Sequence, residues 1–373
     1  MEITAKAREL KAMGKPVIGF GAGEPDFPTP SYIVEAAKEA AENPIYHKYS
    51  QVNGLPTLRE EIVRTTAEYS GYEISSDNVL VTNGGKQAII TAFMSVLDKE
   101  DEVIIPKPYW TTYPEAVKIA GGNPVFLDSN LESNFKITKE QLEEVRTEKT
   151  KLLVWTSPSN PTGVVYTPKE AEEIYEWSIS NDIWILSDEL YEHFVYEGDP
   201  TPSPAIFDND LKNTIIINGV SKAYSMTGWR LGYLITPKSW MSAAAKLHQN
   251  LMISANEFVQ EAGVQVLQES RKTCDAMKDE FNKRRIFLLE RLNQLGLSPG
   301  YQPNSAFYVF LRYRDRLRSS LDLSMEILEK TGVALTPGVD FGPGGEGFLR
   351  FSYANSLENL DRALERLKES GLI

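Results

Sequence analysis

Lys222 stands where a lysine could attack a carbonyl group. Residues 214–217 are a β-branched run that predicts a buried strand, and the strand ends in a small-residue turn that presents Lys222. Burial at such a strand end lowers the pKa of a lysine and makes the neutral amine available as a nucleophile. Arg230 follows in the same segment, and its guanidinium would suit a phosphate because it stays charged and can bind two oxygens. Taken alone, the pair favours a simpler interpretation, a surface lysine and a salt-bridged arginine.

Three further loops at predicted strand ends contain chemically specific residues. Residues 83–86 (Asn-Gly-Gly-Lys) open a predicted helix, where backbone N–H groups can hold an anion, although a plain glycine turn explains them equally well. Asp188 ends an apolar strand, where a carboxylate is costly unless it is paired, but it could also cap a helix. Asn160 lies between prolines, where its amide could donate to a ligand or simply stabilise the turn.

Arg350 and Tyr191 complete this set of candidates. Arg350 lies in an apolar strand and needs a carboxylate, which either a substrate or a structural ion pair could supply. Tyr191 stands three residues after Asp188. Its hydroxyl could reach the phenolate oxygen of a pyridoxal-phosphate ring, or its side chain could simply pack in the core. A lysine with a phosphate anchor is the pair that a pyridoxal-phosphate enzyme needs, and an aspartate that keeps the pyridine nitrogen protonated strengthens the ring as an electron sink. We therefore expect pyridoxal 5'-phosphate as the cofactor.

The composition argues against several classes of partner. The chain has 373 residues, and its formal net charge of −13 makes nucleic acid and anionic membranes poor partners. The single cysteine, Cys274, excludes an internal disulfide and fits a reducing compartment. The three histidines are too scattered for a metal site, and we find no signal peptide or membrane-spanning run. We expect a cytoplasmic protein without a metal.

Strands and helices alternate along most of the chain. This alternation predicts an α/β fold with a mostly parallel sheet flanked by helices, in which the C-terminal ends of the strands meet at one edge. The strands are expected at 79–82, 102–105, 124–127, 151–155, 183–186 and 214–217. A smaller α+β region, with strands at 306–311, 333–336 and 348–353, closes the chain. We expect a large domain at 32–272 and a small domain made of 1–31 and 273–373. The segment 46–49 is expected to be a loop between two helices.

The motifs, in this order, resemble class I aminotransferases, which are fold type I enzymes that use pyridoxal phosphate. The similarity covers essentially the whole chain and is closest to the bacterial aspartate aminotransferase subgroup. The motifs that carry it are Gly-Glu-Pro-Asp-Phe (23–27), Asn-Gly-Gly-Lys-Gln (83–87), Pro-Tyr-Trp (108–110), Ser-Pro-Ser-Asn-Pro-Thr-Gly (157–163), Ser-Asp-Glu-Leu-Tyr (187–191) and Met-Thr-Gly-Trp-Arg-Leu-Gly-Tyr (226–233).

The resemblance implies a role for each candidate around the cofactor ring. Lys222 would bind the cofactor covalently and then move the proton of the substrate, and Asp188 would pair with the pyridinium nitrogen. Asn160 and Tyr191 would contact the phenolate oxygen, and Trp110 would stack on the ring. The phosphate would be held by Ser221, Arg230 and the backbone N–H groups of Gly85 and Lys86. The α-carboxylate of the substrate would be bound by Arg350, with Asn160 and Gly23 beside it.

The same resemblance implies an amino-acid:2-oxo-acid aminotransferase with a ping-pong cycle. We expect L-aspartate and 2-oxoglutarate as substrates, because Lys86 corresponds to a lysine associated with the distal carboxylate of a dicarboxylic substrate. An aromatic, alanine or prephenate aminotransferase stays open, as does a pyridoxal-phosphate-dependent β-lyase. Tyr49 resembles the tyrosine that reaches the phosphate of the neighbouring subunit, so we expect a homodimer.

The chain departs from the subgroup at two places. It begins later than expected, without an arm that crosses to the partner and without polar residues near the distal carboxylate, so both dimer strength and dicarboxylate affinity are in question. Gly219 stands where some relatives have a phosphate-binding hydroxyl. Ser221 would then take over more of that role.

Overall fold

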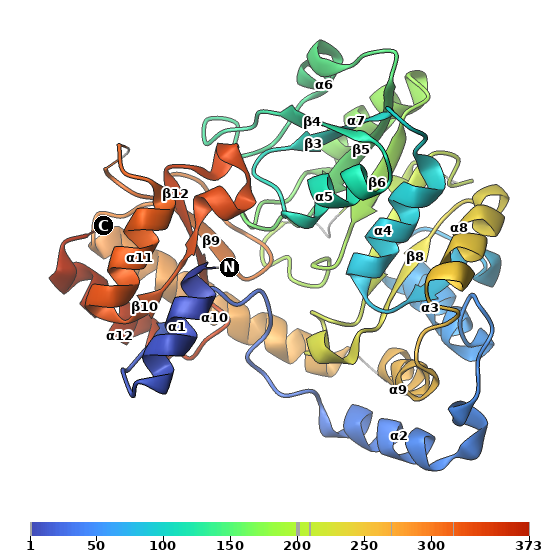
Figure 1. Ribbon diagram of the computed structural model, residues 1–373, viewed down its shortest axis with the longest axis horizontal. Helices are drawn as coiled ribbons and strands as arrows, with labels where there is room; N and C mark the ends of the chain where they lie inside the picture. Colours follow the sequence, from blue (N-terminus) through green and yellow to red (C-terminus); the bar gives the residue numbers. More distant parts are fainter. Residues whose placement is uncertain (1, 199–201, 209, 270, 316, 373) are drawn as a thin grey trace.

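A seven-stranded sheet forms the centre of the larger part of the molecule (Figure 1). The computed structural model describes residues 2–372 apart from 199–201, 209, 270 and 316. In spatial order, the strands are β2 (Val79–Thr82), β8 (Gly232–Ile235), β7 (Thr214–Gly219), β6 (Trp184–Asp188), β5 (Thr150–Thr156), β3 (Glu102–Pro106) and β4 (Asn123–Leu127). The pairs from β7 to β4 are parallel, whereas β8 is antiparallel to both of its neighbours. The expected mostly parallel sheet is confirmed.

The strands of this sheet are apolar on both faces because helices cover both faces. Along β5, Leu152 and Val154 pack in one hydrophobic cluster, whereas Leu153 and Trp155 pack in another. Successive side chains of a strand point to opposite faces, so the two clusters lie on the two sides of the sheet. The helices of this part are α2 (Ser31–Glu42), α3 (Pro56–Tyr69), α4 (Gly85–Val96), α5 (Thr112–Ile119), α6 (Lys139–Val145), α7 (Pro168–Ser180), α8 (Lys238–Leu251) and α9 (Glu257–Gln268).

The smaller part of the molecule is built from both ends of the chain. Strand β12 (Phe348–Ser352) lies between β11 (Thr336–Pro337) and β9 (Tyr308–Arg312) and is antiparallel to both. One hydrophobic cluster joins Phe20 of the N-terminal segment to Phe281 and Phe351. The helices here are α1 (Glu2–Ala12), α10 (Lys272–Gln294), α11 (Ser320–Thr331) and α12 (Leu357–Ser370). This shared core supports our proposal that residues 1–31 and 273–373 form a small domain and residues 32–272 a large one. Residues 1 and 373, the ends of the small domain, lie outside the described chain.

Two local expectations differ from the structure. The strand expected at 333–336 is two short strands, because β10 (Val333–Ala334) pairs with β1 (Ile18–Gly19), whereas β11 pairs with β12. The loop expected at 46–49 begins inside a short 3-10 helix, Pro44–His47, because Pro44 suits its first position and the Asn43 side chain accepts from the N–H of Ile45. In the described part of the chain, no helix combines the length and apolar character needed to span a membrane. The cytoplasmic location stays a prediction.

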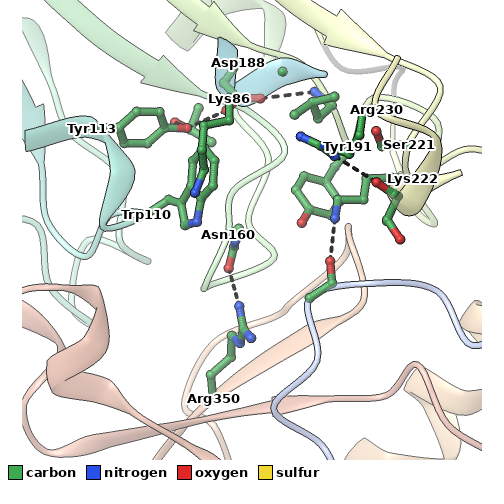
Figure 2. Close-up of a pocket in the computed structure, with 15 residues that line it drawn as sticks. Lys86, Trp110, Tyr113, Asn160, Asp188, Tyr191, Ser221, Lys222, Arg230 and Arg350 are labelled. Carbon is green, nitrogen blue, oxygen red and sulfur yellow. Dashed lines mark hydrogen bonds between the residues drawn. The ribbon is translucent and has the colours of Figure 1, made fainter. Parts of the chain in front are cut away.

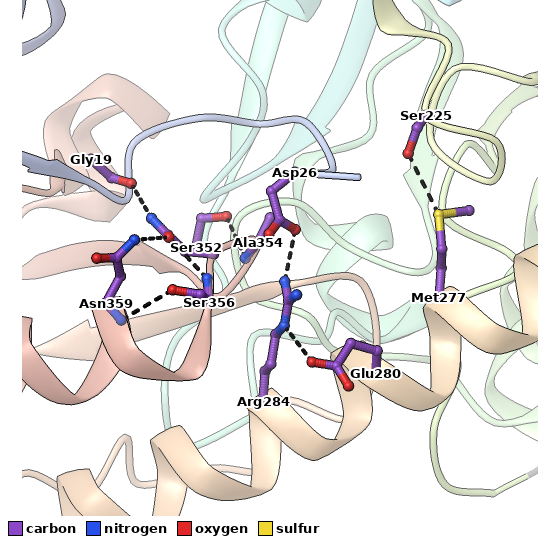
Figure 3. Close-up of polar contacts among 11 residues, drawn as sticks. Gly19, Asp26, Ser225, Met277, Glu280, Arg284, Ser352, Ala354, Ser356 and Asn359 are labelled. Carbon is purple, nitrogen blue, oxygen red and sulfur yellow. Dashed lines mark hydrogen bonds and ion pairs between the residues drawn. The ribbon is translucent and has the colours of Figure 1, made fainter. Parts of the chain in front are cut away.

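The segment 19–29 is hydrogen-bonded to both parts of the molecule. Figure 3 shows its bonds to the smaller part, at Gly19 and Asp26. In the smaller part, Asn355 Nδ2 donates to the carbonyl of Gly19 at 3.0 Å, and Arg284 Nη1 forms an ion pair with Asp26 at 2.7 Å. On the other side, the Thr29 hydroxyl donates to the carbonyl of Ser225 at 2.6 Å. These bonds hold the segment across the boundary between the two parts, next to the turn that carries Lys222.

Candidate active site

A cavity of about 420 Å³ opens at the C-terminal edge of the large sheet (Figure 2). All the candidate residues except Tyr49 line it: Gly23, Gly85, Lys86, Trp110, Asn160, Asp188, Tyr191, Ser221, Lys222, Arg230 and Arg350. Tyr49 lies outside the cavity, with 82% of its surface exposed. The other lining residues are Tyr113, Thr156, Leu190 and Thr227. Leu190 and Thr227 stand within motifs quoted above, but the sequence patterns assigned a role to none of the four.

The Lys222 amine is enclosed between the turn after β7 and the segment 19–29. Its Nζ donates to the carbonyl of Gly23 at 2.5 Å and lies 5.9 Å from the ring centre of Tyr191. Burial lowers the pKa of Lys222 to about 8, with the negative charge of Glu24 opposing this shift. Such a pKa leaves a usable fraction of neutral amine near neutral pH. The interpretation of Lys222 as a surface lysine is therefore wrong.

Both carboxylate oxygens of Asp188 accept hydrogen bonds. The Tyr113 hydroxyl donates to Oδ2 at 2.6 Å, and the backbone N–H of Leu190 donates to Oδ1 at 3.3 Å. Burial raises the pKa of Asp188, and the bond from Tyr113 opposes the rise. Within the described chain no helix begins at Asp188, so the helix-cap interpretation is wrong. Tyr113 lies in the first turn of α5, and its ring packs edge to face against Trp110 with the ring centres 5.7 Å apart. No sequence pattern pointed to it, because Trp110 precedes the helix.

The start of α4 and the Arg230 side chain form an anion-binding corner. Gly84 has a φ of 85°, and a Cβ at this position would lie 2.6 Å from Nη2 of Arg230, so glycine lets the guanidinium approach. Arg230 donates to the backbone carbonyls of Thr227 at 2.8 Å and Asn83 at 3.4 Å, and the described residues offer it no carboxylate. The salt-bridge interpretation is therefore wrong. The first N–H groups of α4 have no acceptor within the helix, so an anion is favoured here.

Arg350 extends from β12 to the cavity, and part of its guanidinium has no hydrogen-bond acceptor. Its Nη1 donates to Oδ1 of Asn160 at 2.9 Å, and its Nη2 donates to the carbonyl of Gly21 at 2.8 Å. Its Nε is buried without a hydrogen-bond partner. Among the described residues, no carboxylate pairs with Arg350, so the structural ion pair is excluded. A buried guanidinium in this state favours an anionic ligand.

Residues 15–367 match the profile of the family described as aminotransferase class I and II. This chain belongs to that family. It is 43% identical to an aspartate aminotransferase of Streptomyces avermitilis, over 99% of this chain and 92% of the relative. It is 37% identical to aromatic-amino-acid aminotransferase 2 of Thermococcus litoralis, over 95% of this chain and 91% of the relative. A solved structure of a Thermus thermophilus aspartate aminotransferase double mutant superposes with a TM-score of 0.94 at 37% identity, covering 99% of this chain and 95% of that one.

The aminotransferase uses pyridoxal phosphate, and the residues of the cavity fit this cofactor. Arg230 and the start of α4 offer donors to a phosphate, and Lys222 offers an amine of lowered pKa to an aldehyde. The buried Nε of Arg350 lacks a partner, as expected of a group that awaits a carboxylate. When bound, the cofactor stabilises negative charge at the α-carbon of the substrate.

The attachment of the cofactor to the cofactor-free aminotransferase should depend on pH through Lys222. Only the neutral amine attacks the aldehyde, so the rate should rise with pH up to about 8 and level off above it. A lysine of ordinary pKa, about 10.4, would give a rate that continues to rise well above pH 8. Stopped-flow absorbance of the lysine-bound cofactor measures this rate, and a continued rise of that kind would contradict the low pKa.

Gly219 of the aminotransferase is required by strand packing. It lies opposite Gly232 on β8, and a Cβ at position 219 would lie 2.8 Å from the Cα of Gly232. Gly219→Ser should therefore destabilise the protein by about 1–3 kcal/mol rather than add a phosphate contact. Urea unfolding of the cofactor-free protein measures this loss. Gly228→Ser is the matched control, because a Cβ there meets nothing within 4 Å. Tighter cofactor binding at unchanged stability would contradict the prediction.

Proposed function

We propose that this aminotransferase moves the amino group of L-aspartate to 2-oxoglutarate by a ping-pong cycle. The observation that supports a dicarboxylate is a pair of cations in one cavity. Lys86 at the start of α4 and Arg350 on β12 both line it, and neither is paired with a carboxylate of the described chain. The Lys86 amine lies 5.2 Å from the ring centre of Trp110 (Figure 2). Two separate cations suit a substrate with two carboxylates.

We assign the chemical steps to the residues that surround the Lys222 amine. Lys222 would take the proton from the α-carbon of the substrate and deliver it to the cofactor, and its lowered pKa suits a general base near neutral pH. Asp188 would keep the pyridine nitrogen of the cofactor protonated. Asn160 and Tyr191 would donate to its phenolate oxygen, and Trp110 would stack on its ring. Phosphate binding belongs to Ser221, Arg230 and the N–H groups of Gly85 and Lys86. The α-carboxylate site consists of Arg350, Asn160 and the Gly23 segment.

We also propose that the enzyme is a homodimer. Apolar side chains are exposed on two segments, with Ile45 at 68% and Tyr49 at 82% on the first, and Leu251 at 46% and Met252 at 45% on the second. The two segments lie near one another, because the buried Gln260 side chain is hydrogen-bonded to residues next to each of them. Its partners are Ser50 and Leu55 beside the first segment and Ala255 beside the second. Exposed apolar side chains on two neighbouring segments support a second copy of the chain as the partner that covers them. Sedimentation equilibrium of the wild type tests the dimer.

The half-reaction without an acceptor tests the proposed substrate. L-Aspartate alone should convert the visible absorption of the lysine-bound cofactor into that of its amino form, and 2-oxoglutarate should restore it. Absorption that ignores aspartate would overturn the substrate. Conversion by phenylalanine, alanine or the amino acid formed from prephenate would then favour that alternative, and ammonia release without an acceptor would favour a β-lyase.

Lys86→Gln should lower kcat/KM for aspartate more than for alanine, which lacks the distal carboxylate.

A further inference from the structure

The Tyr308 hydroxyl lies directly behind the candidate active site. Tyr308 begins β9 and is completely buried, and it is not part of the cavity wall. Its hydroxyl lies 2.8 Å from the hydroxyl of Tyr191, which does line the cavity. The Arg350 guanidinium lies over its ring, with Cζ 4.4 Å from the ring centre. Tyr308 thus contacts both the tyrosine next to the Lys222 amine and the arginine that awaits a carboxylate.

The Tyr191–Tyr308 pair has one more proton than it can use internally. Each hydroxyl carries one proton, and only one of the two can donate to the other. The remaining proton needs another acceptor, because a buried donor without one is unfavourable. In the described structure, the Tyr308 hydroxyl has its hydrogen bond with Tyr191. Its charged neighbour Arg350 cannot accept the Tyr308 proton, because a guanidinium only donates. Tyr191 instead borders the cavity, where a ligand oxygen can accept.

The charge distribution favours the same direction of donation. Burial raises the pKa of Tyr191 well above its ordinary value. Burial also raises the pKa of Tyr308, but the nearby Arg350 guanidinium is the next largest influence and opposes this rise. The same guanidinium also opposes the rise for Tyr191, but it lies directly over the ring of Tyr308. A cation over the ring of a phenol makes its hydroxyl a better hydrogen-bond donor. Donation from Tyr308 leaves the Tyr191 proton free to point into the cavity.

We propose that Tyr308 is a positioning residue whose hydroxyl donates to Tyr191 and thereby directs the Tyr191 proton to the phenolate oxygen of pyridoxal phosphate. The proposal rests on the proposed function, which supplies the contact between Tyr191 and that oxygen. Tyr308 itself touches neither cofactor nor substrate. A second donor in a chain polarises the first, so the loss of the Tyr308 hydroxyl should weaken the bond that Tyr191 makes without removing it.

The test is a pH titration of the visible absorption of the substrate-free, lysine-bound cofactor. A hydrogen-bond donor at the phenolate oxygen withdraws negative charge from that oxygen. The nearby nitrogen, which joins Lys222 to the cofactor, then has a lower pKa, and this pKa is the pH midpoint of the titration. Tyr191→Phe should therefore raise the pH midpoint, and Tyr308→Phe should raise it less, by roughly 0.3–0.5 pH unit. The double variant should have the midpoint of Tyr191→Phe alone, because Tyr308 acts only through Tyr191.

Tyr301→Phe is the matched control for the loss of a buried hydroxyl in the same part of the molecule. Its hydroxyl donates to the carbonyl of Thr162 at 2.8 Å, so the variant should lose stability but keep the wild-type midpoint. An unchanged midpoint in Tyr308→Phe, or a further rise in the double variant, would overturn the role of Tyr308 while Tyr191→Phe still supports the proposed site. A wild type without visible absorption after addition of pyridoxal phosphate would overturn the proposed function and this inference together.

Discussion

Lys222→Ala should lower the kcat of amino transfer by roughly four orders of magnitude or more. The variant loses both the nucleophile that attaches the cofactor and the base that moves the substrate proton, and no other lysine amine bonds to the Gly23 carbonyl in the described structure. The cofactor should still bind through the phosphate site, because Arg230 and the start of α4 are untouched. Single-turnover absorbance with L-aspartate measures the loss, and near-normal turnover would remove Lys222 from the mechanism.

Lys246→Ala is the matched control for this experiment, since Lys246 is exposed on α8. It removes the same charge and the same side-chain atoms far from the cavity, so kcat should stay at the wild-type value. Circular dichroism of the Lys222 variant should also match the wild type, because the amine is held by one hydrogen bond to a loop carbonyl. A loss of secondary structure would show that the defect is one of folding.

Asp188→Asn should lower kcat by roughly 10²–10³-fold, with a smaller change in KM. The amide has the shape of the carboxylate and can still accept from Tyr113, but it lacks the charge that keeps the pyridine nitrogen protonated. Steady-state kinetics with L-aspartate and 2-oxoglutarate measure the effect. If only KM rises, Asp188 contributes to binding and not to the chemical step.

A modified cofactor separates the charge of Asp188 from its hydrogen bonds. Pyridoxal phosphate methylated at the ring nitrogen carries a permanent positive charge, so it should restore part of the activity of Asp188→Asn and should not help the wild type. Asp279→Asn on α10 is the control for loss of an aspartate charge, because Asp279 is exposed. Equal effects of the methylated cofactor on wild type and Asp188→Asn would contradict the assigned role.

The sequence by itself determined that the large sheet is mostly parallel and at which edge its chemistry lies, whereas the strand order and the antiparallel strand β8 came from the structure. Apolar runs such as 214–217 mark strands, and the alternation with helices implies parallel pairing, which brings the C-terminal ends of β5, β6 and β7 to one edge. Asp188 and Lys222 could therefore be placed together from local patterns alone. The motif order was also enough for the family, which the match over residues 15–367 confirms.

Only the tertiary structure decided which neighbours tune these residues. Tyr308 lies 117 positions from Tyr191 in the chain, and Arg350 lies 190 positions from Asn160, so no periodic pattern connects either pair. Whether Arg350 was a structural ion pair or an open anion site depended on what packs around its guanidinium. The shift in the pKa of Lys222 likewise depends on burial beneath the segment 19–29. Local sequence encodes strands and turns, whereas burial and charge around a side chain are set by contacts between distant segments.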